Sequence, residues 1–100
     1  MESLQIELQN NPKSPSFPQL VDLYLAQNMI QEAESLLQRS LKYHPNSVSG
    51  HMLMGRVFQA HNKDELALEQ LNFCIQKAPS NWTCYLLRAQ LYLKLGKPKL

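Results

Sequence analysis

The sequence predicts an all-α protein, an α-solenoid of antiparallel helix pairs, and two observations lead to this fold class. The first is a repeat: matching positions recur with residue numbers that differ by 34, which indicates stacked copies of one small unit. Two such series are Tyr24, Phe58, Tyr92 and Asn28, Asn62, Gly96. The second is composition: leucine supplies 18 of the 100 residues, whereas Val, Ile and Thr together supply seven and glycine three. That balance favours helices over strands.

Size and charge narrow the possibilities further. One hundred residues, 44% of them apolar, fit a single globular domain, 1–100, which we expect to be a segment of a longer repeat protein. The net charge of +2 does not favour nucleic acid or a membrane surface as a partner. We see no signal peptide or membrane-spanning stretch and expect a cytoplasmic protein. Cys74 lies in an apolar helical pattern and should be buried.

Each period contains two helical segments, here called the first-type and the second-type helix. Residues 2–10 are expected to be the end of a second-type helix whose preceding partner is absent, because the same spacing of four recurs at each second-type helix end. The three series are Leu4, Leu8, Pro12; Leu37, Leu41, Pro45; and Leu71, Ile75, Pro79. The numbers of Pro12 and Pro45 differ by one less than a full period, so we infer a one-residue deletion in the loop after residue 10.

The first full repeat, Ser14–Ser47, should contain helices over 16–27 and 29–43. Ser16 with Gln19 and Asn28 with Gln31 have the spacing of capping boxes at the two helix starts. Apolar residues then recur at helical spacing along each segment. Pro45 ends the second helix, because proline cannot continue the hydrogen-bond ladder.

The second full repeat, Val48–Asn81, copies this plan with helices over 47–61 and 63–77. Asn46 or Ser47 should cap the first, and Asn62 with Glu65 forms another capping box. A last first-type helix is expected over 81–95, capped by Ser80 or Asn81 and ended by Gly96.

These positions resemble the tetratricopeptide repeat (TPR) family, a 34-residue helix–turn–helix with small and large apolar residues at set places. In the first copy they are Phe17, Leu20, Val21, Tyr24, Ala33, Leu37, Ser40 and Pro45. In the second they are His51, Met54, Gly55, Phe58, Ala67, Leu71, Cys74 and Pro79. The pattern gives Gly55 the role of letting paired helices approach closely. Two residues depart from it: His51, expected to be a core or half-buried histidine, and Arg88, where leucine is usual.

The resemblance implies that first-type helices line a concave groove that holds a partner polypeptide. Taking residues 18, 22 and 25 as the groove face of the first helix and translating by 34 gives three rows. They are Pro18, Met52, Leu86; Asp22, Arg56, Gln90; and Leu25, Gln59, Leu93. A peptide or amphipathic helix with apolar anchors would suit this surface, with Asp22 and Arg56 fixing its register.

An open alternative is that Asp22 and Arg56 pair with each other across adjacent helices. The sites at which some TPR members grip a C-terminal carboxylate hold no cation in this chain, which argues against that mode of binding. Those sites are occupied by Pro18, Asp22, Leu53, Thr83 and Leu87.

The last helix suggests a second function, self-association. Ten of the fourteen residues from Trp82 to Leu95 are apolar, and such a helix needs neighbours on most sides. We expect Trp82, Leu87, Leu91 and Leu95 to contribute to a homodimer contact.

Catalysis is not expected. The three histidines, His44, His51 and His61, have no partner at a metal-site spacing, and the sequence has neither a GxSxG elbow nor a phosphate loop. We expect no cofactor and no metal. Binding of nucleic acid by a helical repeat is a third and weaker possibility, because the row of Asp22, Arg56 and Gln90 is not basic.

Overall fold

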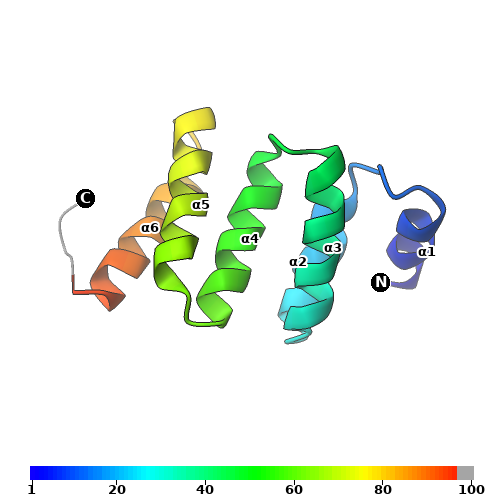
Figure 1. Ribbon diagram of the computed structural model, residues 1–100, viewed down its shortest axis with the longest axis horizontal. Coiled ribbons are helices and arrows are strands. Elements are labelled where there is room, and N and C mark those ends of the chain that lie inside the picture. Colours follow the sequence, from blue (N-terminus) through cyan, green and yellow to red (C-terminus); the bar gives the residue numbers. More distant parts are fainter. Residues whose placement is uncertain (97–100) are drawn as a thin grey trace.

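The computed structural model describes residues 1–96, and within this range the chain forms six α-helices and no strand. The helices are α1 (Glu2–Asn10), α2 (Phe17–Ala26), α3 (Ile30–Tyr43), α4 (Val48–Ala60), α5 (Asp64–Lys77) and α6 (Trp82–Lys94). They follow one another along the long axis of a body of 45 × 26 × 18 Å, with α1 at one end and α6 at the other (Figure 1). The all-α class is therefore confirmed.

Helices that are neighbours in sequence pack together throughout this stack. α2 pairs with α3, and α4 pairs with α5, as two antiparallel hairpins. α4 also contacts α2 and α3 of the preceding hairpin, whereas α1 packs on α2 and α6 packs on α5. Within residues 1–96, no helix has both the length and the apolar character that crossing a bilayer requires.

The turn inside each hairpin repeats with the period of the sequence. Asn28 and Asn62 both have φ of 60°, and Gly96 has φ of 73°. The N–H of Met29 donates to the carbonyl of Tyr24 at 2.8 Å, and the N–H of Lys63, one period later, donates to Phe58 at the same distance. Together with the bonds from Asn28 to Leu25 and from Asn62 to Gln59, both 3.0 Å, these are Schellman motifs that end α2 and α4.

The expected capping boxes at Asn28–Gln31 and Asn62–Glu65 are therefore wrong. Both asparagines lie after the helix that ends, in the left-handed conformation that asparagine tolerates better than most residues. The N-cap positions of α3 and α5 are Met29 and Lys63, and neither provides a side-chain cap.

Of the remaining caps in residues 1–96, only that of α4 is made by a side chain. The Ser47 hydroxyl accepts a 3.0 Å hydrogen bond from the N–H of Gly50, as expected. Ser16 occupies the N-cap position of α2 without a side-chain bond, so the capping box with Gln19 is also wrong. Asn81 is the N-cap residue of α6 but likewise makes no side-chain bond.

The turns that follow second-type helices show that α1 belongs to that type. The residues after α1, α3 and α5 are Asn11, His44 and Ala78, with φ/ψ of −138/86°, −130/64° and −136/75°. In each turn the residue three positions later donates its N–H back to the carbonyl of that residue. The bonds are Ser14 to Asn11 at 3.0 Å, Ser47 to His44 at 3.1 Å and Asn81 to Ala78 at 2.9 Å. Ser14 and Ser47 are one residue short of a full period, whereas Phe17 and His51 are a full period apart, which places the deletion between Ser14 and Phe17.

The repeat is also visible in the core. Ala33 and Ala67 are both fully buried, and Leu37 and Leu71 are 0% and 2% exposed. A first apolar cluster contains buried residues of the four helices α1, α2, α3 and α4, and a second contains buried residues of α5 and α6. Phe58 packs against both clusters. Burial of these side chains, rather than intrinsic helix propensity, stabilises helices of this length.

His51 and Arg88, the two residues that depart from the repeat pattern, are accommodated by polar and aromatic contacts. His51 is half-buried, as expected, and its ring lies 4.1 Å from that of Phe73. Its Nδ1 is 2.7 Å from Gln70 Oε1, and its Nε2 is 2.7 Å from the carbonyl oxygen of Pro45. Arg88 lies over the rings of Tyr85 and Tyr92 and donates a 3.0 Å hydrogen bond to Asn72.

Gly55 lies against its paired helix α5, and a tighter contact that the sequence did not predict occurs at Gly50. A Cβ atom at Gly55 would meet its nearest neighbour, the carbonyl oxygen of Ala67, at an ordinary 3.5 Å. At Gly50 a Cβ would lie 2.8 Å from Leu41 Cδ2 and 3.2 Å from the Phe17 ring. Gly50 therefore allows the start of α4 to contact the preceding hairpin.

Candidate partner-binding surface

The centre of the expected groove is an ion pair between two first-type helices. Arg56 on α4 donates a 2.9 Å hydrogen bond to Asp22 on α2, its equivalent one period earlier. The side chains are 42% and 63% exposed, respectively. The alternative left open by the sequence is therefore realised, since the two charges neutralise each other while remaining at the surface.

The other residues of the three rows divide into two groups. Leu86, Gln90 and Leu93 on α6 are exposed, and the two leucines are exposed by 50% and 70%. The four that belong to α2 and α4 are half-buried. They are Pro18, Leu25, Met52 and Gln59. The surface open to a ligand is consequently most apolar on α6.

A shallow hollow of about 480 Å³ adjoins the ion pair, and three of its lining residues escaped the sequence analysis. Gln19, Leu23 and Ala26 line it together with Asp22 and Arg56. At 100° per residue, positions 19 and 26 lie opposite the buried face of α2, whereas position 23 lies on one flank of that face and positions 18 and 25 lie on the other. That angular placement on the helix was the signal that would have found them.

The residues expected to drive self-association do not share one exposed face. Trp82 is 75% exposed, but Leu91 is fully buried in the second apolar cluster. Leu87 and Leu95 are half-buried and pack against the same cluster. Leu91 is thus a core residue that α5 covers, and the exposed apolar strip of α6 consists of Trp82, Leu86 and Leu93.

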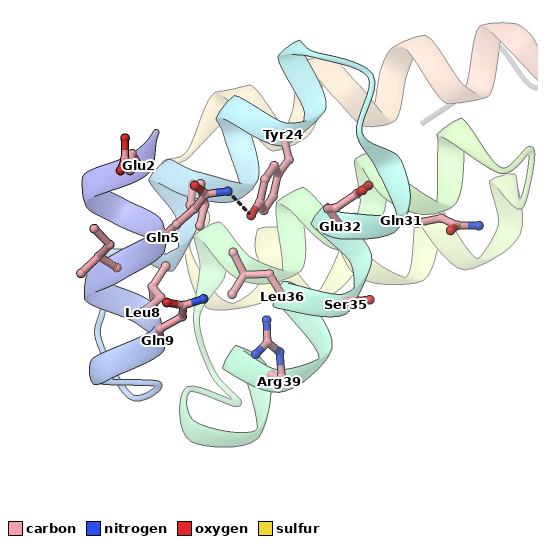
Figure 2. Close-up of a pocket in the computed structure, with 12 residues that line it drawn as sticks. Glu2, Gln5, Leu8, Gln9, Tyr24, Gln31, Glu32, Ser35, Leu36 and Arg39 are labelled. Atoms are coloured by element: carbon pink, nitrogen blue, oxygen red, sulfur yellow. Dashed lines mark hydrogen bonds between the residues drawn. The ribbon is translucent and has the colours of Figure 1, made fainter.

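A second hollow, of about 580 Å³, lies between the outer helices α1 and α3 and is floored by α2. Figure 2 shows Gln5 and Gln9 on α1 and Arg39 on α3 around this hollow, with Leu36 of α3 between them. The amide of Gln5 donates a 3.2 Å hydrogen bond to the Tyr24 hydroxyl across this space. Because α2 separates two helices of the second type, their side chains do not close the gap.

The cysteines are placed for packing. Both are buried free thiols, and the Cys74 thiol donates to the carbonyl of Val48 at 3.3 Å. Burial, with a smaller contribution from neighbouring Cys84, raises the pKa of Cys74 to about 12. Burial also raises the pKa of Cys84. Within residues 1–96 no three His, Cys, Asp or Glu side chains gather in a way that could hold a metal ion.

Comparison with known proteins gives one partial similarity. Half of this chain, 50 residues, is 38% identical to part of the "Cellulose synthase 2 operon protein C" of Komagataeibacter xylinus. The matched segment covers 4% of the length of that protein. No family model matches the chain.

Proposed function

We propose that this chain is a TPR-type scaffold without catalytic activity, and that it binds a peptide or helix of a partner protein along the exposed faces of α2, α4 and α6. One observation carries the proposal: apolar side chains remain exposed on a stack whose backbone turns recur with the period of the sequence. Leu86 and Leu93 on α6 are two of these side chains, at 50% and 70% exposure. Apolar strips of this kind commonly mark sites of protein recognition.

The chemistry of the surface fits an apolar ligand with a limited polar contribution. Leu86 and Leu93 are two helical turns apart on α6, so they would receive anchors spaced along one face of a peptide. The exposed carboxylate of Asp22 retains lone pairs that accept donors from the ligand. A strongly basic or acidic ligand gains little here, because Arg56 and Asp22 already neutralise each other.

Nucleic acid is disfavoured by the same pair. Binding to a phosphate backbone requires several uncompensated cations along one surface. In the row of Asp22, Arg56 and Gln90, the one cation is already engaged by a carboxylate.

The experiment is selection of ligands from a random peptide library by the wild-type chain, followed by affinity measurements on variants. We expect the Arg56→Glu, Leu86→Asp double variant to weaken the selected peptides by more than about tenfold, because a carboxylate would replace an apolar contact. Leu66→Asp is the matched control, since Leu66 is 41% exposed but lies on α5. Peptides that bind the double variant as tightly as the wild type would place recognition elsewhere, and retention of RNA at low salt in place of peptide would overturn the proposal.

A further inference from the structure

The two cysteines of the chain lie on neighbouring helices and are both completely buried. Cys74 is in the last turn of α5 and Cys84 is in the first turn of α6, and each is 0% exposed. The two helices pack side by side (Figure 1). We propose that Cys74 and Cys84 are the site of an intramolecular disulfide, which forms under oxidising conditions and fastens α6 to the α4–α5 hairpin.

The preceding repeat shows which way the side chain of Cys84 points. Its equivalent one period earlier is Gly50 at the start of α4, and the equivalent of Cys74 is Ser40 near the end of α3. A Cβ atom at Gly50 would lie 2.8 Å from Cδ2 of Leu41, the residue next to Ser40. A side chain at this place in the repeat is therefore directed at the end of the preceding second-type helix. In the next repeat Cys84 has such a side chain, and the helix end that it faces carries Cys74.

Cys74 faces the same junction from α5. Its thiol donates a 3.3 Å hydrogen bond to the carbonyl of Val48 at the start of α4. After burial, Cys84 is the next cause of the raised pKa of Cys74. Burial raises the pKa of Cys84 as well, and Cys74 opposes that rise. Each thiol can act on the other in this way only because the two sulfur atoms are close together.

Oxidation would cost the reduced junction one weak hydrogen bond. The Val48 carbonyl would lose the Cys74 thiol as a donor, but as the first residue of α4 it still accepts a backbone N–H within the helix. The disulfide itself has no N–H or O–H group that burial would leave without a partner. The residue numbers of the two cysteines differ by ten, so the bond would close a short loop and restrict the unfolded chain.

The reaction needs an oxidant, and a low-molecular-weight disulfide such as oxidised glutathione is sufficient. In a chain whose junction has opened, the thiolate of one cysteine attacks the glutathione disulfide and releases one glutathione thiolate. The thiolate of the other cysteine then attacks the protein sulfur of the mixed disulfide and releases the second glutathione. The two protein thiols lose two protons and two electrons, which are recovered in two molecules of reduced glutathione.

Burial determines how the bond behaves after it has formed. Reduction requires a thiolate to reach one of the two sulfur atoms, and both are covered in the folded chain. The native protein should therefore keep the bond for as long as the junction stays closed. α6 also carries Leu86 and Leu93, so the bond would hold their exposed apolar surface in place on the stack.

The test oxidises the wild-type chain with oxidised glutathione while it refolds from urea, so that burial does not block the reaction. The product should be a monomer without attached glutathione, lighter than the reduced chain by two hydrogen atoms. Lys77 lies between the two cysteines, so trypsin separates them in the reduced chain. In the oxidised chain, the tryptic fragments 64–77 and 78–88 should remain joined until a reductant is added.

Stability provides the second readout. The thermal midpoint of the oxidised chain should exceed that of the reduced chain by at least about 5 °C, because the bond restricts the unfolded state. By the same linkage, the equilibrium constant for forming the bond in glutathione buffers should be at least about tenfold larger in the native chain than in urea. Cys74→Ser and Cys84→Ala are the controls, since Ser40 and Gly50 show that small side chains are accepted at these places. Neither control should form an internal bond or gain stability on oxidation.

Three results would overturn the inference. Disulfide-linked dimers or glutathione adducts as the main products would show that the two sulfur atoms do not meet in the folded chain. An oxidised chain that melts below the reduced chain would show that the native junction opposes the bond. Equal equilibrium constants in the native chain and in urea would show that folding does not bring the thiols together. None of these measurements involves a peptide ligand, so the result is separable from the proposed function.

Discussion

The carboxylate of Asp22 accepts a 2.9 Å hydrogen bond from the guanidinium of Arg56, which lies one repeat length later in the chain. The pair joins α2 to α4 at the surface of the stack. Both side chains remain hydrated, and ion pairs of this kind contribute little to stability because water screens them.

We therefore expect Arg56→Ala to lower the free energy of unfolding by less than about 1 kcal/mol. Urea denaturation at low salt measures the change, and about 1 M NaCl should reduce it further. A double-mutant cycle with Asp22→Ala isolates the coupling. A coupling above about 3 kcal/mol would mean that the pair is buried in solution, contrary to the exposure found here.

The positive φ of Asn62 leads to a second prediction, which concerns stability. Asn62→Ala should destabilise the protein by about 1 kcal/mol, because a Cβ-bearing residue without a polar side chain is strained in the left-handed region. Asn62→Gly is the matched control and should be neutral or stabilising, since glycine has no such strain. Equal losses in both variants, measured by thermal unfolding, would contradict the turn geometry described here.

The two helical glycines of α4 give a third prediction. Gly55→Ala should stabilise the protein by up to about 1 kcal/mol, because a Cβ there makes only ordinary contacts and alanine favours helix. Gly50→Ala should not stabilise to the same degree, because its Cβ would collide with Leu41 and crowd Phe17. Comparison of the urea midpoints of the two variants decides the matter, and the reverse order would refute the assignment of the close contact to Gly50.

The buried thiols predict how stability depends on alkaline pH. The pKa of Cys74 in the folded chain is about 12, above the ordinary value of 9.0, so the neutral thiol is favoured by folding. The contribution of this thiol to the free energy of unfolding is complete below pH 9. It is lost as the pH rises from 9 towards 12, by at most about 1.4 kcal/mol per pH unit.

Cys74→Ala is the control for this dependence, because tyrosines and lysines also titrate in that range. The wild type should lose stability more steeply than the variant between about pH 9 and pH 11. Cys74 should also react with iodoacetamide at about pH 8 only as fast as the protein unfolds. Rapid modification of the native chain would show that the thiol is accessible.

The sequence alone determined the fold class, the six helices and the repeat phase. Period and helical spacing depend on which residues face inwards, and burial is dictated by side-chain chemistry that the sequence displays directly. The one-residue deletion in the loop after residue 10 was inferred from the prolines, because the numbers of Pro12 and Pro45 differ by one less than a full period.

The tertiary structure decided what happens at helix ends and on exposed faces. Asparagine is common both after the end of a helix and at the start of one, so Asn28 could end α2 or cap α3. Only its backbone φ shows that it ends α2. Its alignment with Gly96 was the available clue. Leu91 and Leu93 are the same residue type two positions apart, yet one is fully buried and the other is 70% exposed. The difference arises because α5 covers one side of α6, and contact between helices is not encoded in the local sequence of either.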